Sequence, residues 1–69
     1  MKNIDFEKLG NRVRLYRKAA NMLQRELADA VAVSEKHITH IENGMKKPSL
    51  ELIARIADVL GVTLSDLVN

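Results

Sequence analysis

Residues 24–44 read QRELADAVAVSEKHITHIENG and contain two short helical patterns with a tight turn between them. We expect one helix over about residues 24–31, and a second that follows an N-cap at Ser34 and ends at Asn43-Gly44, a typical stop signal. The inward positions recur at helical spacing and are Leu27, Ala28, Val31, Ile38 and Ile41. Because about three residues separate the helices, they cannot lie side by side and must cross steeply.

Three further helices are predicted around this pair from apolar periodicity and punctuation. One covers residues 6–20 after an N-cap at Asp5, one lies between Ser49 and Gly61, and a short one begins at Thr63. Their inward positions are Phe6, Leu9, Val13, Tyr16 and Ala20, then Leu50, Ile53, Ile56, Ala57 and Leu60, and finally Leu67. The sequence therefore predicts a compact all-α fold of five helices.

The length and composition limit the classes of function. The chain has 69 residues, 46% of them hydrophobic and 3% aromatic, and it has no cysteine. A chain of this length buries about 60% of its extended surface, so tight helix packing or a partner must stabilise it. We expect a single domain over residues 1–69, no enclosed substrate pocket and hence no enzyme, no catalytic residue and no cofactor. No long apolar run or signal-like N-terminus occurs, so a cytoplasmic protein without a membrane segment is expected.

The charge is more informative in its distribution than in its total. The net charge is only +2, but residues 1–25 carry seven basic and two acidic side chains, a net +5. Residues 26–47 sum to −1 and the remainder to −2. A basic front and an acidic tail suggest one face that meets a polyanion, although a charged solvated helix surface would give the same count.

The face of the third predicted helix that points away from the core is polar. Its residues are Lys36, Thr39, His40 and Asn43, with Glu35 and His37 on either side of them. These side chains are able to reach base edges or phosphates when a helix enters the major groove of DNA. A solvent-exposed helix would be polar as well, so this inventory alone does not decide between the two.

The order and spacing of several short motifs resemble the lambda-repressor-like helix-turn-helix family of Xre and Cro type over residues 9–69. The motifs are LGNRVRLYR (residues 9–17), QRELA (24–28), Val33-Ser34, ITHIENG (38–44), KPSL (47–50) and IARIADVLGV (53–62). The resemblance implies a domain core at about residues 9–67, five helices with the second and third forming the helix-turn-helix, binding to a double-stranded DNA operator, and a homodimer.

The resemblance also implies roles for individual residues. Gln24 matches a glutamine that touches a DNA phosphate, while Lys36 and His40 match positions that read bases. Arg17 and Glu42 match a structural ion pair between the first and third helices. The DNA-contacting set that we predict is Gln24, Arg25, Ser34, Glu35, Lys36, Thr39, His40, Asn43, Lys46 and Lys47.

Three positions raise questions of local geometry. Leu23 stands where the family has a Ser or Thr N-cap, so the second helix lacks a cap that stabilises by about 1 kcal/mol. Ala32 stands where a turn glycine is common, and a left-handed alanine costs about 1–2 kcal/mol. Gly10 lowers helix stability by about 1 kcal/mol relative to alanine unless another element packs closely there.

Two functions from different classes follow from these observations. The leading one is a sequence-specific transcriptional regulator, a repressor that binds a pseudo-palindromic operator as a homodimer, with any effector acting through the dimer contact, a second protein or degradation. The alternative is an antitoxin or protein-interaction adaptor that uses exposed apolar residues, expected at Leu52, Val59, Leu64 and Val68. His37 and His40 offer two metal ligands without a third nearby, so no metal site is predicted.

Overall fold

The computed structural model describes residues 3–69, which form five helices and no strand. The helices are α1 (Phe6–Ala19), α2 (Gln24–Ala30), α3 (Glu35–Glu42), α4 (Leu50–Leu60) and α5 (Leu64–Val68). The all-α class and the order of the elements are therefore confirmed, and the helix ends lie within about one residue of the predicted ones. Met1 and Lys2, the latter one of the seven bases counted in the first 25 residues, lie outside the described residues.

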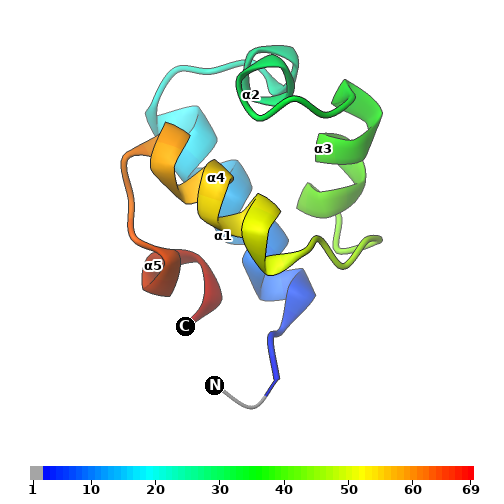
Figure 1. Ribbon diagram of the computed structural model, residues 1–69, viewed down its shortest axis with the longest axis vertical. Helices are drawn as coiled ribbons and strands as arrows, with labels where there is room; N and C mark the ends of the chain where they lie inside the picture. The colour runs from blue at the N-terminus through cyan, green and yellow to red at the C-terminus, as the bar shows by residue number, and fades with distance from the viewer. Residues whose placement is uncertain (1–2) are drawn as a thin grey trace.

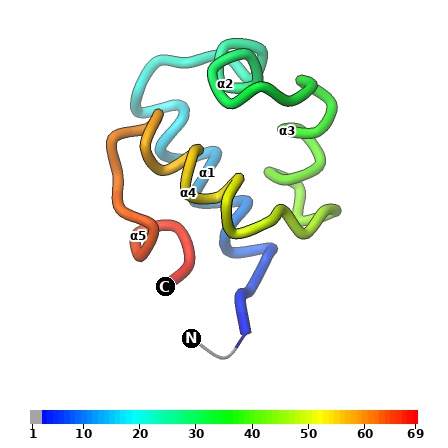
Figure 2. Tube along the Cα trace, viewed as in Figure 1, coloured from blue at the N-terminus to red at the C-terminus, as the bar shows by residue number. Residues whose placement is uncertain are grey.

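The helices leave one side of α3 uncovered. α3 packs against α1 and α2, while α5 packs against α1 and α4. In Figure 1, α2 is seen end-on and α3 from the side, so the two cross steeply, as their short connection predicts. The Cα trace places α1 and α4 across the middle of the molecule, with α3 at one side and α5 at the other (Figure 2). The outer side of α3 is thereby held out to solvent on a rigid base.

Local hydrogen bonds fix where the helices begin. Four helices start at a side-chain oxygen that accepts a backbone N–H three residues later, and these N-caps are the predicted Asp5, Ser34, Ser49 and Thr63. The exception among the described helices is α2, whose N-cap residue Leu23 has no side-chain acceptor. There the Glu26 carboxylate accepts the Leu23 N–H at 2.8 Å, which keeps one half of a capping box.

A common C-terminal motif ends α1 to α4. In each, a left-handed residue follows the helix and two backbone N–H groups return to carbonyls of the last turn, the arrangement of a Schellman motif. The left-handed residues are Asn21 (φ 56°), Ala32 (φ 61°), Gly44 (φ 74°) and Gly61 (φ 72°). Asparagine and glycine tolerate this conformation, whereas alanine carries a Cβ that crowds the following carbonyl. The strain considered for Ala32 is therefore present in the turn between α2 and α3.

Replacing Ala32 by glycine should stabilise the fold. The relief of the left-handed strain exceeds the extra chain entropy of glycine in the unfolded state, so we expect a gain of about 0.5–1 kcal/mol. Chemical denaturation of the purified protein measures it. Ala30→Gly is the matched control because Ala30 lies in the last turn of α2 and is exposed, so the same change there should destabilise by a similar amount. A loss of stability in Ala32→Gly would contradict the interpretation.

The core follows most of the predicted inward positions. Its buried apolar side chains are Leu9, Val13, Leu27, Ala28, Val31, Ile38, Ile41, Leu52, Ile53, Ile56, Ala57 and Leu67. Phe6, Tyr16 and Leu60 are partly buried against it. The predictions for Ala20 and Leu50 are wrong: Ala20 lies past the end of α1 and is exposed, and Leu50 is 52% exposed.

Three of the four apolar residues suggested for a partner are less exposed than predicted. Leu52 is 5% exposed, and Leu64 and Val68 are partly buried against the core, whereas Val59 is exposed as expected. The core-facing stripe of α4 is centred near Ile56, so Leu52 turns inward while Leu50, in the first turn, lies at the edge of the core.

None of the helices within residues 3–69 is long and apolar enough to span a membrane.

Candidate nucleic-acid interface

The exposed side of α3 carries the residues that sequence reasoning placed there. Glu35 and Lys36 are exposed in the first turn, and Asn43 is exposed at the C-terminal end. His40 is half-buried between them, and Ile38 and Ile41 on the opposite side are completely buried. Ser34 is exposed, but its hydroxyl is used as the N-cap and accepts the His37 N–H at 3.0 Å. The buried side anchors the helix, so its outer side chains project from a fixed backbone.

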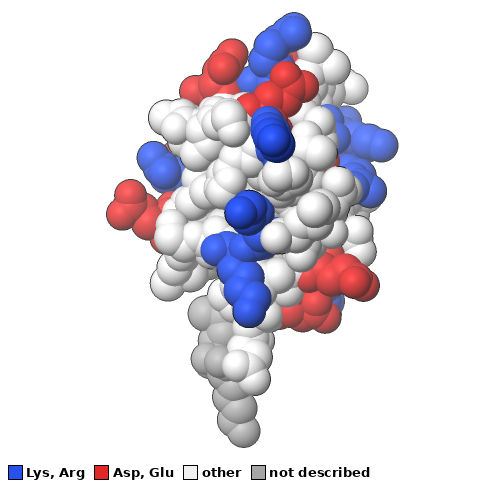
Figure 3. Space-filling model, turned by 90° about the vertical axis from the view of Figure 1, so that its right-hand side faces the viewer, with Lys and Arg blue, Asp and Glu red and all other residues white. Residues whose placement is uncertain are grey.

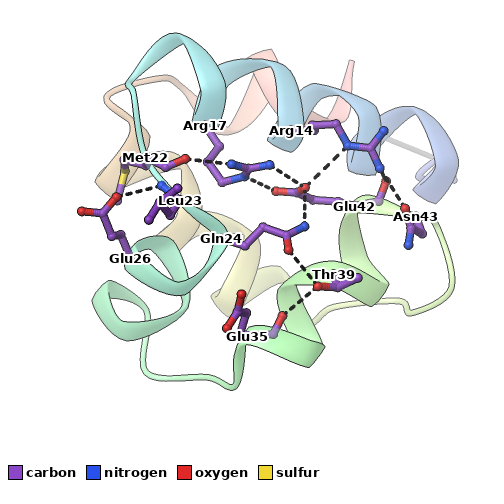
Figure 4. A network of polar contacts seen from close by, with 10 residues as sticks. All are labelled: Arg14, Arg17, Met22, Leu23, Gln24, Glu26, Glu35, Thr39, Glu42 and Asn43. Carbon is purple, nitrogen blue, oxygen red and sulfur yellow. Dashed lines mark hydrogen bonds and ion pairs between the residues drawn. The ribbon is translucent and has the colours of Figure 1, made fainter.

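A buried ion pair joins α1 to α3. Arg17 donates from Nε to Glu42 Oε2 at 2.6 Å and from Nη2 to Glu42 Oε1 at 3.1 Å, while its Nη1 donates to the Met22 carbonyl at 2.7 Å (Figure 4). Arg17 is 8% exposed and Glu42 1% exposed. A fork of this kind is strong and fixes the two side chains relative to each other. All three guanidinium nitrogens of Arg17 are used inside the protein.

Gln24 extends this network to α2. Its Nε2 donates to Glu42 Oε1 at 3.0 Å, and its Oε1 accepts the Thr39 hydroxyl at 3.0 Å (Figure 4). The same hydroxyl lies 3.1 Å from the Glu35 carbonyl oxygen. Thr39 therefore faces α2 more than solvent. Gln24, at the start of α2, therefore connects α2 to two residues of α3, one of which belongs to the ion pair.

Glu42 is ionised in this network over the ordinary pH range. Its burial by itself raises the pKa, but hydrogen bonds from Arg17 and Gln24 and the charges of Arg17 and Arg14 outweigh that effect. Together they hold the pKa of Glu42 below its ordinary value of 4.5. Within the described residues, no buried side-chain nitrogen or oxygen lacks a hydrogen-bond partner, so the network is completely satisfied.

A second set of polar groups gathers where α3 ends. Arg14 of α1 donates from Nη2 to Asn43 Oδ1 at 2.8 Å and lies within reach of the Glu42 carbonyl oxygen at 3.4 Å. Lys46 and Lys47 follow in an exposed loop. The C-terminal end of α3 is thus surrounded by positive charge, which compensates the negative end of the helix dipole.

Close backbone contact between α1 and α3 occurs at Gly10. A Cβ atom at this position would lie 2.8 Å from the Glu42 carbonyl oxygen and closer still to that of Ile41. Any side chain there would push α3 away from α1. The sequence analysis allowed Gly10 within a helix only if another element packs closely against it, and that element is the last turn of α3.

Positive charge runs along the α3 side of the molecule. Figure 3 views the protein from the side on which α3 lies in Figure 1. Lys and Arg side chains run down the middle of this face, whereas Asp and Glu side chains lie mostly toward its margins. Such an arrangement favours the approach of a polyanion. Residues 3–69 form no pocket, so the chemistry of this face is that of an open surface.

Comparison with known proteins assigns this arrangement to a family. A family model described as helix-turn-helix (HTH_3) matches residues 13–67. The chain belongs to this helix-turn-helix family. The resemblance to lambda-repressor-like proteins of Xre type is thereby confirmed. An uncharacterised HTH-type transcriptional regulator of Methanocaldococcus jannaschii is 39% identical over 57 residues, which are 83% of this chain and 86% of the relative.

Solved structures agree with the helix-turn-helix assignment. The clp gene regulator ClgR from Corynebacterium glutamicum matches with a TM-score of 0.89 and 33% identity, over 97% of this chain and 71% of ClgR. SinR, a master regulator for biofilm formation that was solved in complex with DNA, matches with a TM-score of 0.83 and 27% identity, over 88% of this chain and 98% of SinR.

The helix-turn-helix brings the predicted residues together to different degrees. Lys36, His40 and Asn43 share the outer side of α3, and Gln24 lies beside it. Arg25 is exposed on α2, while Lys46 and Lys47 lie in the loop after α3. Sequence reasoning missed Arg14, which contacts Asn43 although 29 residues separate them. Its spacing of three residues from Arg17 was the available signal, because such residues share one side of a helix.

Proposed function

We propose that the chain is a sequence-specific DNA-binding transcriptional regulator and acts as a repressor. The observation that carries this proposal is the outer side of α3, where Lys36 and His40 project from a helix fixed on its other side by Arg17, Glu42 and Gln24. An α-helix fits the major groove, and these side chain types donate to base edges there. Membership of the helix-turn-helix family and the DNA-bound relative SinR support the same function.

We further propose that two copies bind one operator. A symmetric dimer places two α3 helices in successive major grooves about 34 Å apart, which requires a pseudo-palindromic site. In the bound state, phosphate contacts come from Gln24, Arg25, Asn43, Lys46 and Lys47, and base contacts from Lys36 and His40, with Ser34, Glu35 and Thr39 beside them. The chain performs no catalysis in this role, and effectors act through the dimer contact or a second protein.

Selection of bound duplexes from random DNA tests the proposal directly. The expected product is a short palindrome whose half-sites lie about one helical turn apart. Light scattering of the purified protein, with and without the selected duplex, measures the stoichiometry. A protein that selects no sequence and stays monomeric would favour the adaptor or antitoxin alternative. The exposed large apolar side chains available for such a partner are Leu15, Leu23, Met45, Leu50 and Val59.

Substitutions in α3 should change discrimination rather than general affinity. In Lys36→Ala and His40→Ala, loss of a base contact should reduce the preference for the selected duplex over a scrambled one by about 1–3 kcal/mol. Fluorescence anisotropy at one salt concentration measures both affinities.

Lys47→Ala is the control, because losing a phosphate contact should weaken binding to both duplexes alike.

Glu35→Gln should bind the two duplexes more evenly, since the carboxylate of Glu35 repels phosphate but accepts from the amino group of cytosine. Unchanged discrimination in both alanine variants of α3 would contradict base reading by this side of the helix.

A further inference from the structure

Arg14 reaches from α1 to the end of α3 with only part of its guanidinium in use. Its Nη2 donates to Asn43 Oδ1 at 2.8 Å and lies 3.4 Å from the Glu42 carbonyl oxygen, and its Nε lies 3.6 Å from Glu42 Oε1 (Figure 4). One edge of the group is therefore held against α3. Within residues 3–69 no group accepts from Nη1, and the side chain is 40% exposed, so the other edge presents donors to solvent.

The contact also fixes the side-chain amide of Asn43. Because Asn43 Oδ1 accepts from Arg14, the Nδ2 group points away from that bond and offers its two N–H donors. Asn43 is exposed at the end of the outer side of α3. A charged donor from α1 and a neutral donor at the end of α3 thus lie on either side of the Arg14–Asn43 hydrogen bond (Figure 4). No group within the described residues accepts from Arg14 Nη1.

We propose that Arg14 and Asn43 form one phosphate-binding site for the sugar-phosphate backbone of DNA, which joins α1 to the end of α3. The inference rests on the proposed function and adds a residue from outside the helix-turn-helix. A planar guanidinium matches the geometry of a phosphate, and charge-assisted hydrogen bonds of this type are the stronger ones. Because a phosphate carries no sequence information, the site sets the position of the protein on the duplex and not its sequence preference.

The competing explanation is that Arg14 only stabilises the end of α3. A positive charge beside the last carbonyls of a helix does this without DNA. The two explanations differ in the salt dependence of DNA binding, because each phosphate contact releases counterions and contributes about 0.9 to the slope of log affinity against log salt. A purely structural arginine would leave that slope unchanged in the folded protein.

The experiment compares Arg14→Gln, Arg14→Lys and Arg12→Gln by anisotropy titration on the selected duplex and a scrambled duplex over a range of salt concentrations. Arg14→Gln should weaken binding to both duplexes by about tenfold and lower the slope by about 1. Arg14→Lys should keep the slope near the wild-type value with weaker binding, because it keeps the charge and loses the fork. Arg12→Gln removes the same charge from α1, but Arg12 contacts the Asp66 carbonyl of α5, so it should leave the slope unchanged.

A double-mutant cycle with Asn43→Ala tests whether the two residues share one phosphate. The combined loss should be smaller than the product of the single losses by about fivefold. A wild-type slope in folded Arg14→Gln, or independent effects of the two substitutions, would overturn the shared site. If the wild-type protein itself fails to bind either duplex, the proposed function fails instead, so the two failures are distinguishable. Circular dichroism melting of each variant gives the folded fraction used in the titrations.

Discussion

Glu42→Gln is expected to be among the most destabilising substitutions in the chain. It keeps the shape of the side chain but leaves the buried Arg17 guanidinium without its counter-charge, and it replaces an acceptor used by Gln24. Removing one partner of a buried ion pair typically costs about 3–5 kcal/mol. A domain of 69 residues has a total free energy of unfolding of about 3–10 kcal/mol, so most of it would be lost. Urea denaturation followed by circular dichroism measures the change.

Two further variants test whether the loss of stability comes from the buried ion pair and not from the removal of any one carboxylate. Glu51→Gln removes an exposed carboxylate from the first turn of α4 and should change stability by about 0.5 kcal/mol or less. The double variant Arg17→Met and Glu42→Leu should recover much of the loss, because apolar side chains of similar volume often replace a buried pair without penalty. Equal stability of Glu42→Gln and Glu51→Gln would show that the ion pair contributes nothing.

The pH dependence of stability has a defined direction. Because the pKa of Glu42 is lower in the folded than in the unfolded chain, the unfolded chain takes up the proton first as the pH falls. The stabilisation from Glu42 is complete above its ordinary pKa of 4.5 and is lost as the pH falls through the folded value. Asp66 acts in the same direction, since hydrogen bonds from Thr63 hold its pKa below 3.8. The melting temperature of Glu42→Gln should therefore decline less steeply in acid than that of the wild type.

The helix starts could be predicted because each depends on a few neighbouring residues. Ser34 caps α3 by accepting an N–H three residues further on, and Thr63 does the same for α5. The core residues of α2 and α3 follow from their spacing alone, since Leu27 and Ile38 each lie in the middle of a periodic pattern. The strained Ala32 was also visible as a departure from a family pattern.

What could not be predicted depends on how the helices are placed against one another. Leu50 was expected in the apolar stripe of α4 and Leu52 among its exposed residues, but the core-facing stripe is centred near Ile56, so Leu52 is buried and Leu50 lies at the edge of the core. Arg14 is one of several arginines in α1, and its contact with Asn43 exists because α1 and α3 are in close contact. Thr39 was likewise expected to point outward, but its hydroxyl donates to Gln24 Oε1. That contact also depends on how α2 and α3 are placed against each other.

Gly10→Ala is expected to destabilise the fold strongly, against the preference of a helix for alanine. Gly10 lies within α1, where alanine would ordinarily stabilise by about 1 kcal/mol. The added Cβ would instead meet the carbonyl oxygens of Ile41 and Glu42, which belong to backbone and cannot turn aside. Overpacking against a rigid neighbour costs about 3 kcal/mol or more, so the melting temperature should fall by at least about 10 °C.

The sign of this change distinguishes tertiary contact from helix propensity. Asn11→Ala is the matched control, because Asn11 is the next residue of the same helix and is exposed, and alanine there should stabilise by about 0.5 kcal/mol. Opposite signs at adjacent positions require that α3 lies against α1 at Gly10. In the fraction of Gly10→Ala that stays folded, we expect α3 to be displaced from Arg14. The DNA affinity of this variant should therefore fall even after correction for the unfolded fraction. A stabilising effect of Gly10→Ala would contradict the close approach of the two helices.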